Sequence, residues 1–432
     1  MDDDKKLCAW VVAVSMGYGH QRTAYPLKYL APNGVFINAN DYEGMPELDR
    51  SRWESVRKFY EFISRLKFSS WLGALTFSIF DHFQKIISFY PKVKNERTTF
   101  DLRQIFKWLK DGWGKDLIDK LAKNPLPFIA TFSVPAFMAE YFNYPGEIYC
   151  VVSDTDVARP WVALNPEKSR IKYLAPTKRV AERLKLYGVK EGNIFLTGYP
   201  LPKENIGDNL EIVKSDLSER LLNLDPKGSY SRYFLPLIQS YIGKQLSKPG
   251  HILTLLLSIG GAGAQKEMAI QIVVSLKKKI KNKEIRLMLS AGAREEVKNY
   301  FENEIRSVGL ERELNKGVFI ISADNLDDYF KKFNIALRTT DILWTKPSEL
   351  SFYCALGIPI IIAPPIGSQE DFNREWILRL GTGIDQKDLN YIDQWLFDLL
   401  DDGWFAGAAM HGYIEAEKRG VFNIEKIVCN KE

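Results

Sequence analysis

The chain has few cysteines and few histidines, four of each among 432 residues, and no long hydrophobic run. The cysteines are scattered as Cys8, Cys150, Cys354 and Cys429. Because no two form a Cys-x-x-Cys pair, we expect neither a disulfide framework nor a zinc site, and this usage favours a reducing compartment. The apolar run from Leu7 to Met16 enters a glycine-containing turn, which predicts a buried strand and not a signal peptide. The run Trp71–Phe80 is too short to span a bilayer, so we expect a cytoplasmic protein that associates with a membrane only peripherally.

The chain also has little net charge, because 59 basic and 54 acidic side chains leave +5, and nothing in this balance indicates a nucleic-acid partner. The excess is concentrated in residues 51–115, which hold 13 basic and 6 acidic residues and 15 of the 55 aromatic residues. Trp53, Val56 and Tyr60 recur there at helical spacing. Together with further tryptophans such as Trp108 and Trp113, this pattern favours amphipathic helices at an anionic lipid surface. The alternative is that the rings face the protein's own core and the charges are solvated.

Apolar residues form 46% of the chain and charged residues 26%, as in soluble proteins with more than one core. Short apolar runs alternate with helical patterns, which predicts an α/β fold with doubly wound parallel sheets. The expected strands of the first half are residues 7–15, 35–38, 128–131, 148–152, 171–174 and 194–197. Those of the second half are residues 252–258, 285–290, 318–321, 335–338 and 358–363.

Each half opens with a strand, a glycine turn and a helix, so we predict two Rossmann-like domains with a ligand site at the carboxyl ends of their strands. Residues 1–202 are expected to form the first domain, with a basic aromatic helical insertion at about 51–115. Residues 203–250 are expected to form a linker with a helical insertion, residues 251–415 the second domain, and residues 416–432 a C-terminal helix.

The first glycine turn carries the sequence Ser-Met-Gly-Tyr-Gly-His from Ser15 to His20. Gly17 and Gly19 allow a sharp turn after the strand and close approach of a ligand. His20 then falls near a helix N-terminus at the carboxyl edge of the sheet, where a histidine can act as a general base near neutral pH. In the alternative interpretation, the glycines only shape the turn and His20 caps it.

The second half offers a glycine turn at Gly260, Gly261 and Gly263, whose backbone N–H groups could face a phosphate. It is neither a P-loop nor a full dinucleotide fingerprint, and it is also compatible with a simple strand–helix turn. Further along, the segment Thr345–Glu349 leads into a helix, and we expect Pro347 to lie in the first turn of that helix. After the next strand, Gln369, Glu370 and Asn373 supply the donors and acceptors that sugar hydroxyls need.

Taken in order, these motifs resemble the family of monogalactosyldiacylglycerol synthases and processive diacylglycerol glucosyltransferases. That family is related to the peptidoglycan N-acetylglucosaminyl transferase, which works on a lipid-linked precursor. The matching segments are Ser15–His20, Ser153-Asp154 through Trp161, Gly188-Val189, Ile194–Pro200, Gly260-Gly261, Thr345–Glu349 and Ser368–Asn373. They cover about half of the chain in the family's order.

The resemblance implies a GT-B fold, with two Rossmann-like domains facing each other across a cleft. It implies a hexosyltransferase for glycolipid synthesis that takes a nucleotide-sugar, a UDP-sugar, as donor and a lipid or membrane-associated hydroxyl as acceptor. Inversion without a metal or other cofactor is expected. His20 would be the base, Asp154 would orient His20 or the acceptor, and Gly17, Gly19 and Trp161 would lie on the acceptor side.

The resemblance also assigns a set of residues to binding of the donor, that is, of its diphosphate and its sugar. Those assigned to the donor are Gly260, Gly261, Gly263, Lys346, Pro347, Ser348, Glu349, Gln369, Glu370 and Asn373.

Two residues depart from the family pattern. Cys354 stands where the family has the glutamate that holds the ribose, and Glu349 replaces a glycine beside the expected diphosphate. Glu349 could supply the missing ribose ligand, or the donor site could be altered or inactive. The alternatives to transfer are therefore a degenerate protein that binds a nucleotide or a lipid surface without transfer, and an epimerase or hydrolytic relative on the same fold.

Overall fold

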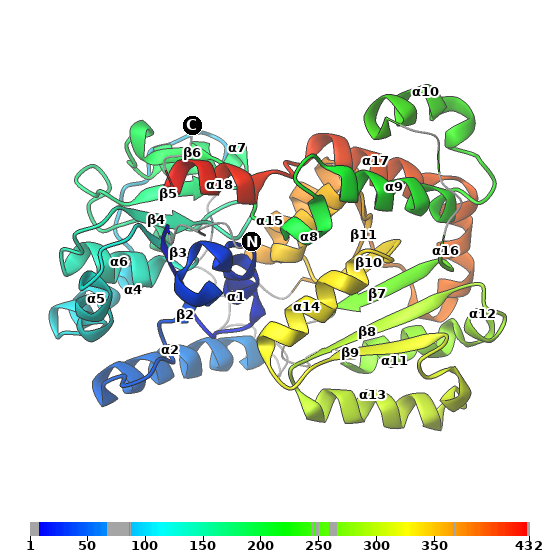
Figure 1. Ribbon diagram of the computed structural model, residues 1–432, viewed down its shortest axis with the longest axis horizontal. Coiled ribbons are helices and arrows are strands. Elements are labelled where there is room, and N and C mark those ends of the chain that lie inside the picture. The colour runs from blue at the N-terminus through cyan, green and yellow to red at the C-terminus, as the bar shows by residue number, and fades with distance from the viewer. Residues whose placement is uncertain are drawn as a thin grey trace, which may run out of the picture. The chain divides into compact units, whose positions relative to one another are not determined.

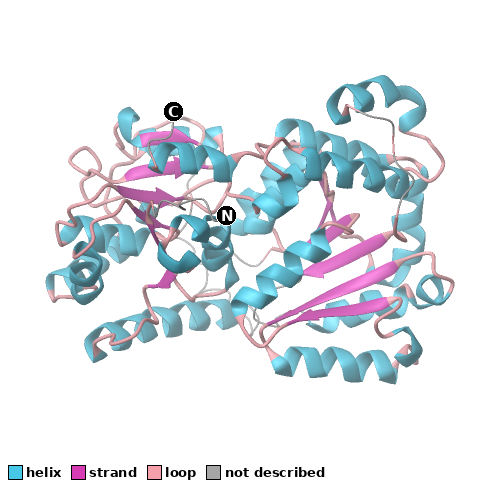
Figure 2. Cartoon of the chain, in the orientation of Figure 1, coloured by secondary structure: helices cyan, strands magenta, loops and turns pink. Residues whose placement is uncertain are grey.

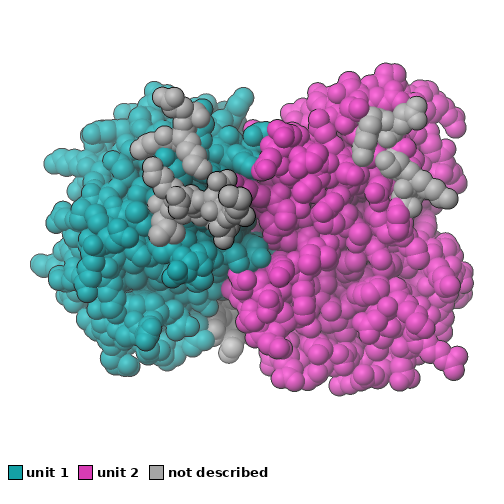
Figure 3. Space-filling model, in the orientation of Figure 1, with its two compact units in different colours: residues 1–200, 366–373, 419–432 teal, residues 201–365, 374–418 magenta. Residues whose placement is uncertain are grey.

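The computed structural model describes residues 8–66, 86, 88–243, 246, 250–258, 266–365 and 368–429. Two compact units make up the chain (Figure 3). Unit 1 comprises residues 1–200, 366–373 and 419–432, and unit 2 comprises residues 201–365 and 374–418. The chain therefore returns to unit 1 twice after it first leaves it.

Unit 1 is built on a six-stranded parallel sheet with the strand order β2-β1-β3-β4-β5-β6 (Figure 1). Its strands are β1 (Trp10–Ala13), β2 (Ile37–Asn38), β3 (Phe128–Ala130), β4 (Ile148–Val151), β5 (Lys172–Ala175) and β6 (Ile194–Leu196). All six overlap the strands expected from the sequence. Both faces of the central strands are covered, which explains their continuous apolar runs.

Helices cover the sheet of unit 1, as Figure 2 shows. They are α1 (Tyr18–Ala24), α2 (Glu47–Leu66), α4 (Phe100–Lys110), α5 (Lys115–Ala122), α6 (Ser133–Tyr141), α7 (Lys178–Leu186) and α18 (Gly420–Val428). Short 3-10 helices add η1 (Tyr25–Leu30), η2 (Pro32–Gly34), η3 (Arg159–Trp161) and η4 (Glu191–Asn193).

The described tryptophans of the basic aromatic segment serve the core of unit 1. Trp53 and Trp113 are 3% and 0% exposed, and their rings meet edge-on at 4.8 Å. Trp108 packs on Trp113 at 5.5 Å. Burial in the protein accounts for Trp53 and Trp113, so these two rings give no support to the membrane expectation, which stays a prediction. Trp71 and the rest of 67–85 lie outside the described residues.

Unit 2 holds a second six-stranded parallel sheet, with the order β12-β11-β10-β7-β8-β9. Its strands are β7 (Thr254–Ser258), β8 (Arg286–Gly292), β9 (Val318–Ser322), β10 (Ile342–Thr345), β11 (Ile360–Ile362) and β12 (Gly383–Asp385). Counted from β7, this is the Rossmann order 3-2-1-4-5-6. The chain is thus an α/β protein with two Rossmann-like domains.

Three helices of unit 2 precede its first strand: α8 (Lys203–Ile206), α9 (Glu211–Leu224) and α10 (Ser231–Ile242). The later ones are α11 (Lys266–Ser275), α12 (Lys277–Lys281), α13 (Glu295–Ser307), α14 (Leu326–Leu337), α16 (Ile392–Asp401) and α17 (Trp404–Glu415), with 3-10 helices η5 (Glu311–Glu313), η6 (Glu349–Leu356) and η7 (Leu389–Tyr391). The boundary between the units falls inside α15 (Ser368–Arg379). Residues 203–250, expected to be a linker with a helical insertion, contribute α8 to α10.

One expected strand was wrong. Residues 335–338 end α14, where Ile335 is 63% exposed, and the strand at this point is β10, between β7 and β11. The apolar residues of a helix end resemble a short strand when they are read without their partners.

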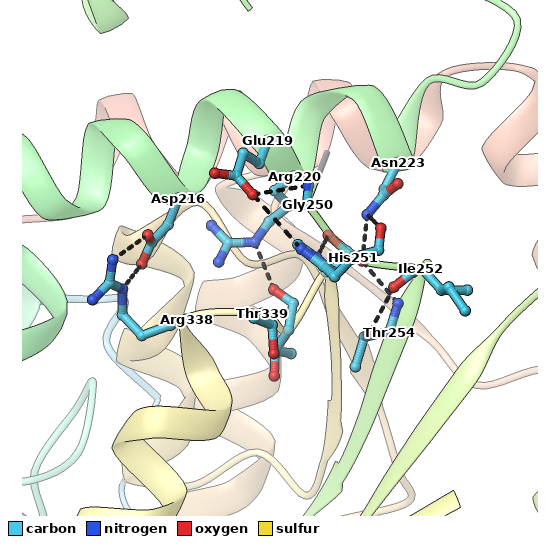
Figure 4. A network of polar contacts seen from close by, with 12 residues as sticks. Asp216, Glu219, Arg220, Asn223, Gly250, His251, Ile252, Thr254, Arg338 and Thr339 are labelled. Carbon is cyan, nitrogen blue, oxygen red and sulfur yellow. Dashed lines mark hydrogen bonds and ion pairs between the residues drawn. The ribbon is translucent and has the colours of Figure 1, made fainter. Parts of the chain in front are cut away.

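A buried polar network attaches α9 to the amino ends of β7 and β10 (Figure 4). The fully buried Arg220 donates from Nε to the Thr340 carbonyl at 2.6 Å and from Nη1 to the Leu356 carbonyl at 2.9 Å. Asp341 accepts from the Thr254 amide at 2.8 Å and lies 3.2 Å from His251 Nε2. These contacts lie at the edge opposite the carboxyl ends of the strands, so they support the fold and not the expected ligand site.

The cysteine prediction was also wrong in one respect. Cys8 and Cys429 form a disulfide, with Cα atoms 5.6 Å apart, which ties α18 to the segment before β1. The partners are separated by 421 residues, so no local spacing could indicate the pair. Cys150 and Cys354 are buried free thiols.

Within the described ranges, no helix combines the length and the apolar character needed to cross a membrane.

Candidate functional site

The two sheets place their ligand edges at the strands where the order of connection reverses. In unit 1 this point lies between β1 and β3, and in unit 2 between β7 and β10. In open α/β sheets, ligands bind outside the carboxyl ends of such strands. The expected site residues therefore divide into two groups, one in each unit.

The first group begins with the turn between β1 and α1. Gly17 is the N-cap of α1 and has φ of 91°, a conformation that side chains with a Cβ rarely adopt. A Cβ there would meet nothing within 4 Å, so backbone conformation, and not space, requires this glycine. Gly19 lies in the first turn of α1, where its carbonyl accepts from Thr23 Oγ1 at 2.9 Å. Both glycines lie at the carboxyl edge of β1, as the sequence predicts.

His20 bridges the two strands of this switch point. Its Nδ1 lies 2.9 Å from the carbonyl oxygen of Thr131, the residue after β3, and Thr131 Oγ1 donates back to the His20 carbonyl at 2.8 Å. A carbonyl oxygen only accepts, so Nδ1 carries the proton. In the neutral ring, Nε2 then keeps its lone pair, and this tautomer is that of a general base.

Aromatic rings enclose the imidazole. Phe132 and Trp161 lie 4.7 and 5.9 Å from it, centroid to centroid. Burial lowers the pKa of His20 from 6.5 to about 4, although the hydrogen bond to Thr131 acts in the opposite direction. The ring is therefore neutral throughout the physiological range. Trp161, which the resemblance assigns to the acceptor side, is part of this enclosure.

Polar side chains around the turn were missed in the sequence. Asn40 Oδ1 accepts from the Ser15 amide at 2.7 Å, and Gln21 Nε2 donates to Asn38 Oδ1 at 2.9 Å. Asn38 is the last residue of β2 and Asn40 follows it, at the same carboxyl edge as the glycine turn. Their signal was the Asn-Ala-Asn-Asp run at the end of a short strand, which is typical of a ligand edge.

Asp154 lies on the loop after β4 and is bonded to Asn373, not to His20. Asn373 Nδ2 donates to Asp154 Oδ1 at 2.9 Å, and Asn373 Oδ1 accepts from both the amide and the hydroxyl of Thr155, at 2.9 and 2.8 Å. Asn373 is 1% exposed. Its amide is therefore used within unit 1 and fixes the start of α15 to the β4 loop.

The second group lies at the switch point of unit 2. Thr345, the last residue of β10, donates from Oγ1 to the carbonyl of Ser258, the last residue of β7, at 2.9 Å. Lys346, Pro347, Ser348 and Glu349 follow directly. Gly260, Gly261 and Gly263 fall in the sequence between β7 and α11, outside the described residues.

The helix after this loop, η6, begins at Glu349 and therefore later than the sequence predicts. Ser348 is the N-cap of η6, and its Oγ accepts from the Leu350 amide at 3.4 Å. Pro347 therefore precedes the cap and does not lie in the first turn as predicted. Glu349 occupies the first turn, where its charge interacts favourably with the positive end of the helix. The same charge opposes a second anion at that end.

Cys354 does not reach a ligand surface. It is 0% exposed, and burial raises the pKa of its thiol to about 12. A buried neutral thiol cannot take the part of a ribose-binding carboxylate. Gln369 and Glu370 lie in the first turn of α15, in the portion that groups with unit 1, whereas Lys346–Glu349 groups with unit 2.

Comparisons with known proteins give the following matches. A family model described as a domain of unknown function, DUF6938, matches residues 244–316. No curated protein sequence matches the chain.

Several solved structures resemble the chain at low identity. The UDP-GlcNAc 2-epimerase from Neisseria meningitidis bound to UDP-GlcNAc is 12% identical, with 78% of this chain and 83% of that chain covered and a TM-score of 0.45. MurG from Acinetobacter baumannii is 12% identical, with coverage of 78% and 81% and a TM-score of 0.40. The spinosyn rhamnosyltransferase SpnG is 12% identical, with coverage of 97% and 99% and a TM-score of 0.41.

Proposed function

We propose that this chain is a glycosyltransferase that moves a sugar from a UDP-sugar to a hydroxyl of a lipid or membrane-associated acceptor, with inversion and without a metal. The observation that carries the proposal is the imidazole of His20. It lies at the switch point of unit 1, its Nδ1 donates to the Thr131 carbonyl, and its Nε2 is the basic atom. The family resemblance of the motifs supports the same chemistry.

In the proposed reaction, His20 Nε2 takes the proton of the acceptor hydroxyl while the oxygen attacks the anomeric carbon of the sugar. The bond between that carbon and the diphosphate oxygen breaks, and the nucleoside diphosphate leaves with the electron pair. Since Nδ1 of His20 is bonded to Thr131, we assign Asp154 to the acceptor and not to His20.

The donor is proposed to bind at the edge of unit 2. N–H groups of Gly261, Gly263 and Ser348, with the ammonium of Lys346, would stabilise the charge that develops on the leaving diphosphate. Gln369 and Glu370 would bind the sugar hydroxyls. Asn373 would contribute by holding the start of α15, because its own amide is already bonded.

The test is transfer from a panel of nucleotide-sugars to acceptor lipids in detergent, with His20→Asn compared with the parent chain. We expect turnover to fall about 10²–10⁴-fold, the usual contribution of a general base. His411→Asn is the matched control, because His411 Nδ1 also faces a backbone carbonyl, that of Gly381 at 3.3 Å, within unit 2. Equal loss in both variants, or unchanged turnover of His20→Asn, would refute the role of His20.

A second candidate is a protein that binds a nucleotide without transfer. The buried thiol of Cys354 and the charge of Glu349 at the start of η6 favour it, because the expected ribose carboxylate is missing and a carboxylate stands near the expected diphosphate. Thermal unfolding separates the two: a nucleotide that raises the melting temperature while no donor supports transfer indicates binding alone.

A further inference from the structure

The helix α10 presents a large apolar surface to solvent. Six consecutive residues from Arg232 to Leu237 are exposed. Tyr233, at 73%, is the most exposed large apolar residue of the helix, and the others are Phe234 at 44%, Leu235, Leu237 and Tyr241 at 40% each. Figure 1 shows α10 at the periphery of unit 2, beside α9.

The helix is attached by a narrow inner ridge. Ile238 and Ile242, one turn apart, are 1% and 3% exposed, and Tyr241 meets the ring of Tyr413 edge-on at 6.5 Å. By contrast, α13 buries Val297, Phe301 and Ile305 and carries glutamate and lysine elsewhere on its surface. A helix on the surface of a soluble protein normally has a polar outer face, as α13 does. The apolar outer face of α10 therefore indicates an interaction surface.

The sequence of this helix and its flanks is basic, whereas in the structure Asp225 accepts from the amides of Tyr230 and Ser231, at 3.1 and 2.7 Å, at the start of α10. From residue 226 to residue 250 the sequence contains four basic residues and no acidic residue. Among the described ones, Arg232 is exposed beside Tyr233, and Lys227 pairs with Asp401 at 2.7 Å. Tyrosine, phenylalanine and leucine side chains next to basic groups are typical of helices that lie in the headgroup region of an anionic membrane.

The size of the face disfavours a second copy of the chain. At about 200 Å² per large side chain, the five exposed residues offer roughly 400–500 Å². A stable protein interface needs about 800 Å² on each partner. Insertion of a protruding helix into lipid headgroups needs no such area.

We propose that α10 is a membrane-docking helix, whose Tyr233, Phe234 and Leu237 enter the interface of an anionic bilayer while Arg232 contacts lipid phosphates. This assignment is independent of glycosyl transfer, because vesicle binding is measured without a donor. It also differs from the expectation for residues 51–115, whose described tryptophans are used in the core.

The experiment is co-sedimentation of the full chain with phosphatidylcholine vesicles with and without phosphatidylglycerol. We expect binding only to the anionic vesicles, and a decrease of tenfold or more in the partition coefficient of Phe234→Ser/Leu237→Ser. Arg232→Gln should lower it about fivefold, the equivalent of ~1 kcal/mol per basic side chain near the surface.

The matched control is Val274→Ser/Ile335→Ser, which removes two apolar side chains of unit 2 that are 49% and 63% exposed, outside α10. It should bind as the parent does. Tyr90→Ser/Val93→Ser tests the basic aromatic segment, where these residues are 67% and 58% exposed. Loss of binding in that variant, with binding retained in Phe234→Ser/Leu237→Ser, would overturn the proposal.

A second measurement guards against misfolding of the serine variant. In Tyr233→Cys, the new thiol is labelled with an environment-sensitive fluorophore. The label is selective, because Cys150 and Cys354 are buried and Cys8 and Cys429 are paired. Its emission should shift to the blue on anionic vesicles, whereas the same label at Ile335→Cys should not shift. No shift at 233, or a chain that is dimeric by light scattering and becomes monomeric in Phe234→Ser/Leu237→Ser, refutes the membrane assignment.

Discussion

Asn373 donates a hydrogen bond to Asp154 over 2.9 Å, and the two residues are 219 positions apart in the sequence. The carbonyl side of the same amide accepts twice from Thr155. Asn373 thereby connects the segment that re-enters unit 1 to the loop after β4, and its amide is satisfied without a ligand. Asn373, which the sequence assigns to the donor sugar, thus also holds the start of α15 against the loop after β4.

Asn373→Asp should destabilise unit 1 by about 2–3 kcal/mol at neutral pH, because a carboxylate would then face Asp154 in place of the amide donor. Part of this loss should return as the pH is lowered and one of the two carboxyls takes up a proton. Urea unfolding at two pH values measures both effects. Asn390→Asp, in η7, is the control: Asn390 Nδ2 also donates to a carboxylate, that of Asp388 at 2.9 Å, but Asn390 is exposed, so stability should change little. Loss of donor affinity with unchanged stability would instead favour a direct role for Asn373.

The pH dependence of transfer should report the unusual histidine. The neutral imidazole is the active form, and the pKa of His20 is lowered to about 4 by burial. Activity should therefore persist well below pH 6.5 and decline only as the pH approaches 4. A profile of kcat/KM against pH for the free enzyme measures this. If kcat/KM instead falls with a midpoint near pH 6.5, and this fall is absent in His20→Asn, the ring is solvated before substrate binds.

The same imidazole links stability to pH. Its folded pKa of about 4 lies below the value of 6.5 for an exposed ring, so the unfolded chain binds more protons between these values. The free energy of unfolding should decrease as the pH falls from about 6.5 to 4. His20→Gln removes the titrating group, so the slope of stability against pH should be smaller in this variant. An identical slope in both proteins would contradict the lowered pKa of His20.

The disulfide between Cys8 and Cys429 should stabilise unit 1 by about 2–4 kcal/mol, because it limits the freedom of the unfolded chain. A reductant should lower the denaturation midpoint of the parent and leave Cys8→Ser/Cys429→Ser unchanged. Alkylation of the denatured, unreduced protein should label two thiols, those of Cys150 and Cys354. Labelling of all four would show that the pair is not formed.

Arg220 and Arg338 provide a matched comparison of buried and exposed arginines. Arg220→Ala should cost about 3 kcal/mol or more, since it leaves buried carbonyls of Thr340 and Leu356 without their donor. Arg338 is 41% exposed and pairs with Asp216, which is 11% exposed, so Arg338→Ala should cost less than Arg220→Ala, about 1 kcal/mol. Chemical denaturation of both variants measures the difference. Similar costs would mean that the Arg220 network is replaced by water.

The repeated strand and glycine-turn pattern predicted much of the fold, because strands buried on both faces need continuous apolar residues. The same reasoning placed Gly17, Gly19 and His20 at a ligand edge, since a glycine turn after a buried strand has one location in such a sheet. It did not place Asn40 or Thr131, whose roles depend on neighbouring strands.

Local pattern by itself determined the two Rossmann-like halves and the residues at their carboxyl edges, because periodicity and turn chemistry act between near neighbours. The tertiary structure decided which aromatic residues are core and which are exposed: Trp113 is buried and Tyr233 is not, although both lie in basic, aromatic sequence. It also decided that Cys8 meets Cys429 and that Asn373 meets Asp154. Contacts over such separations arise from the packing of whole elements, and no short stretch of sequence encodes them.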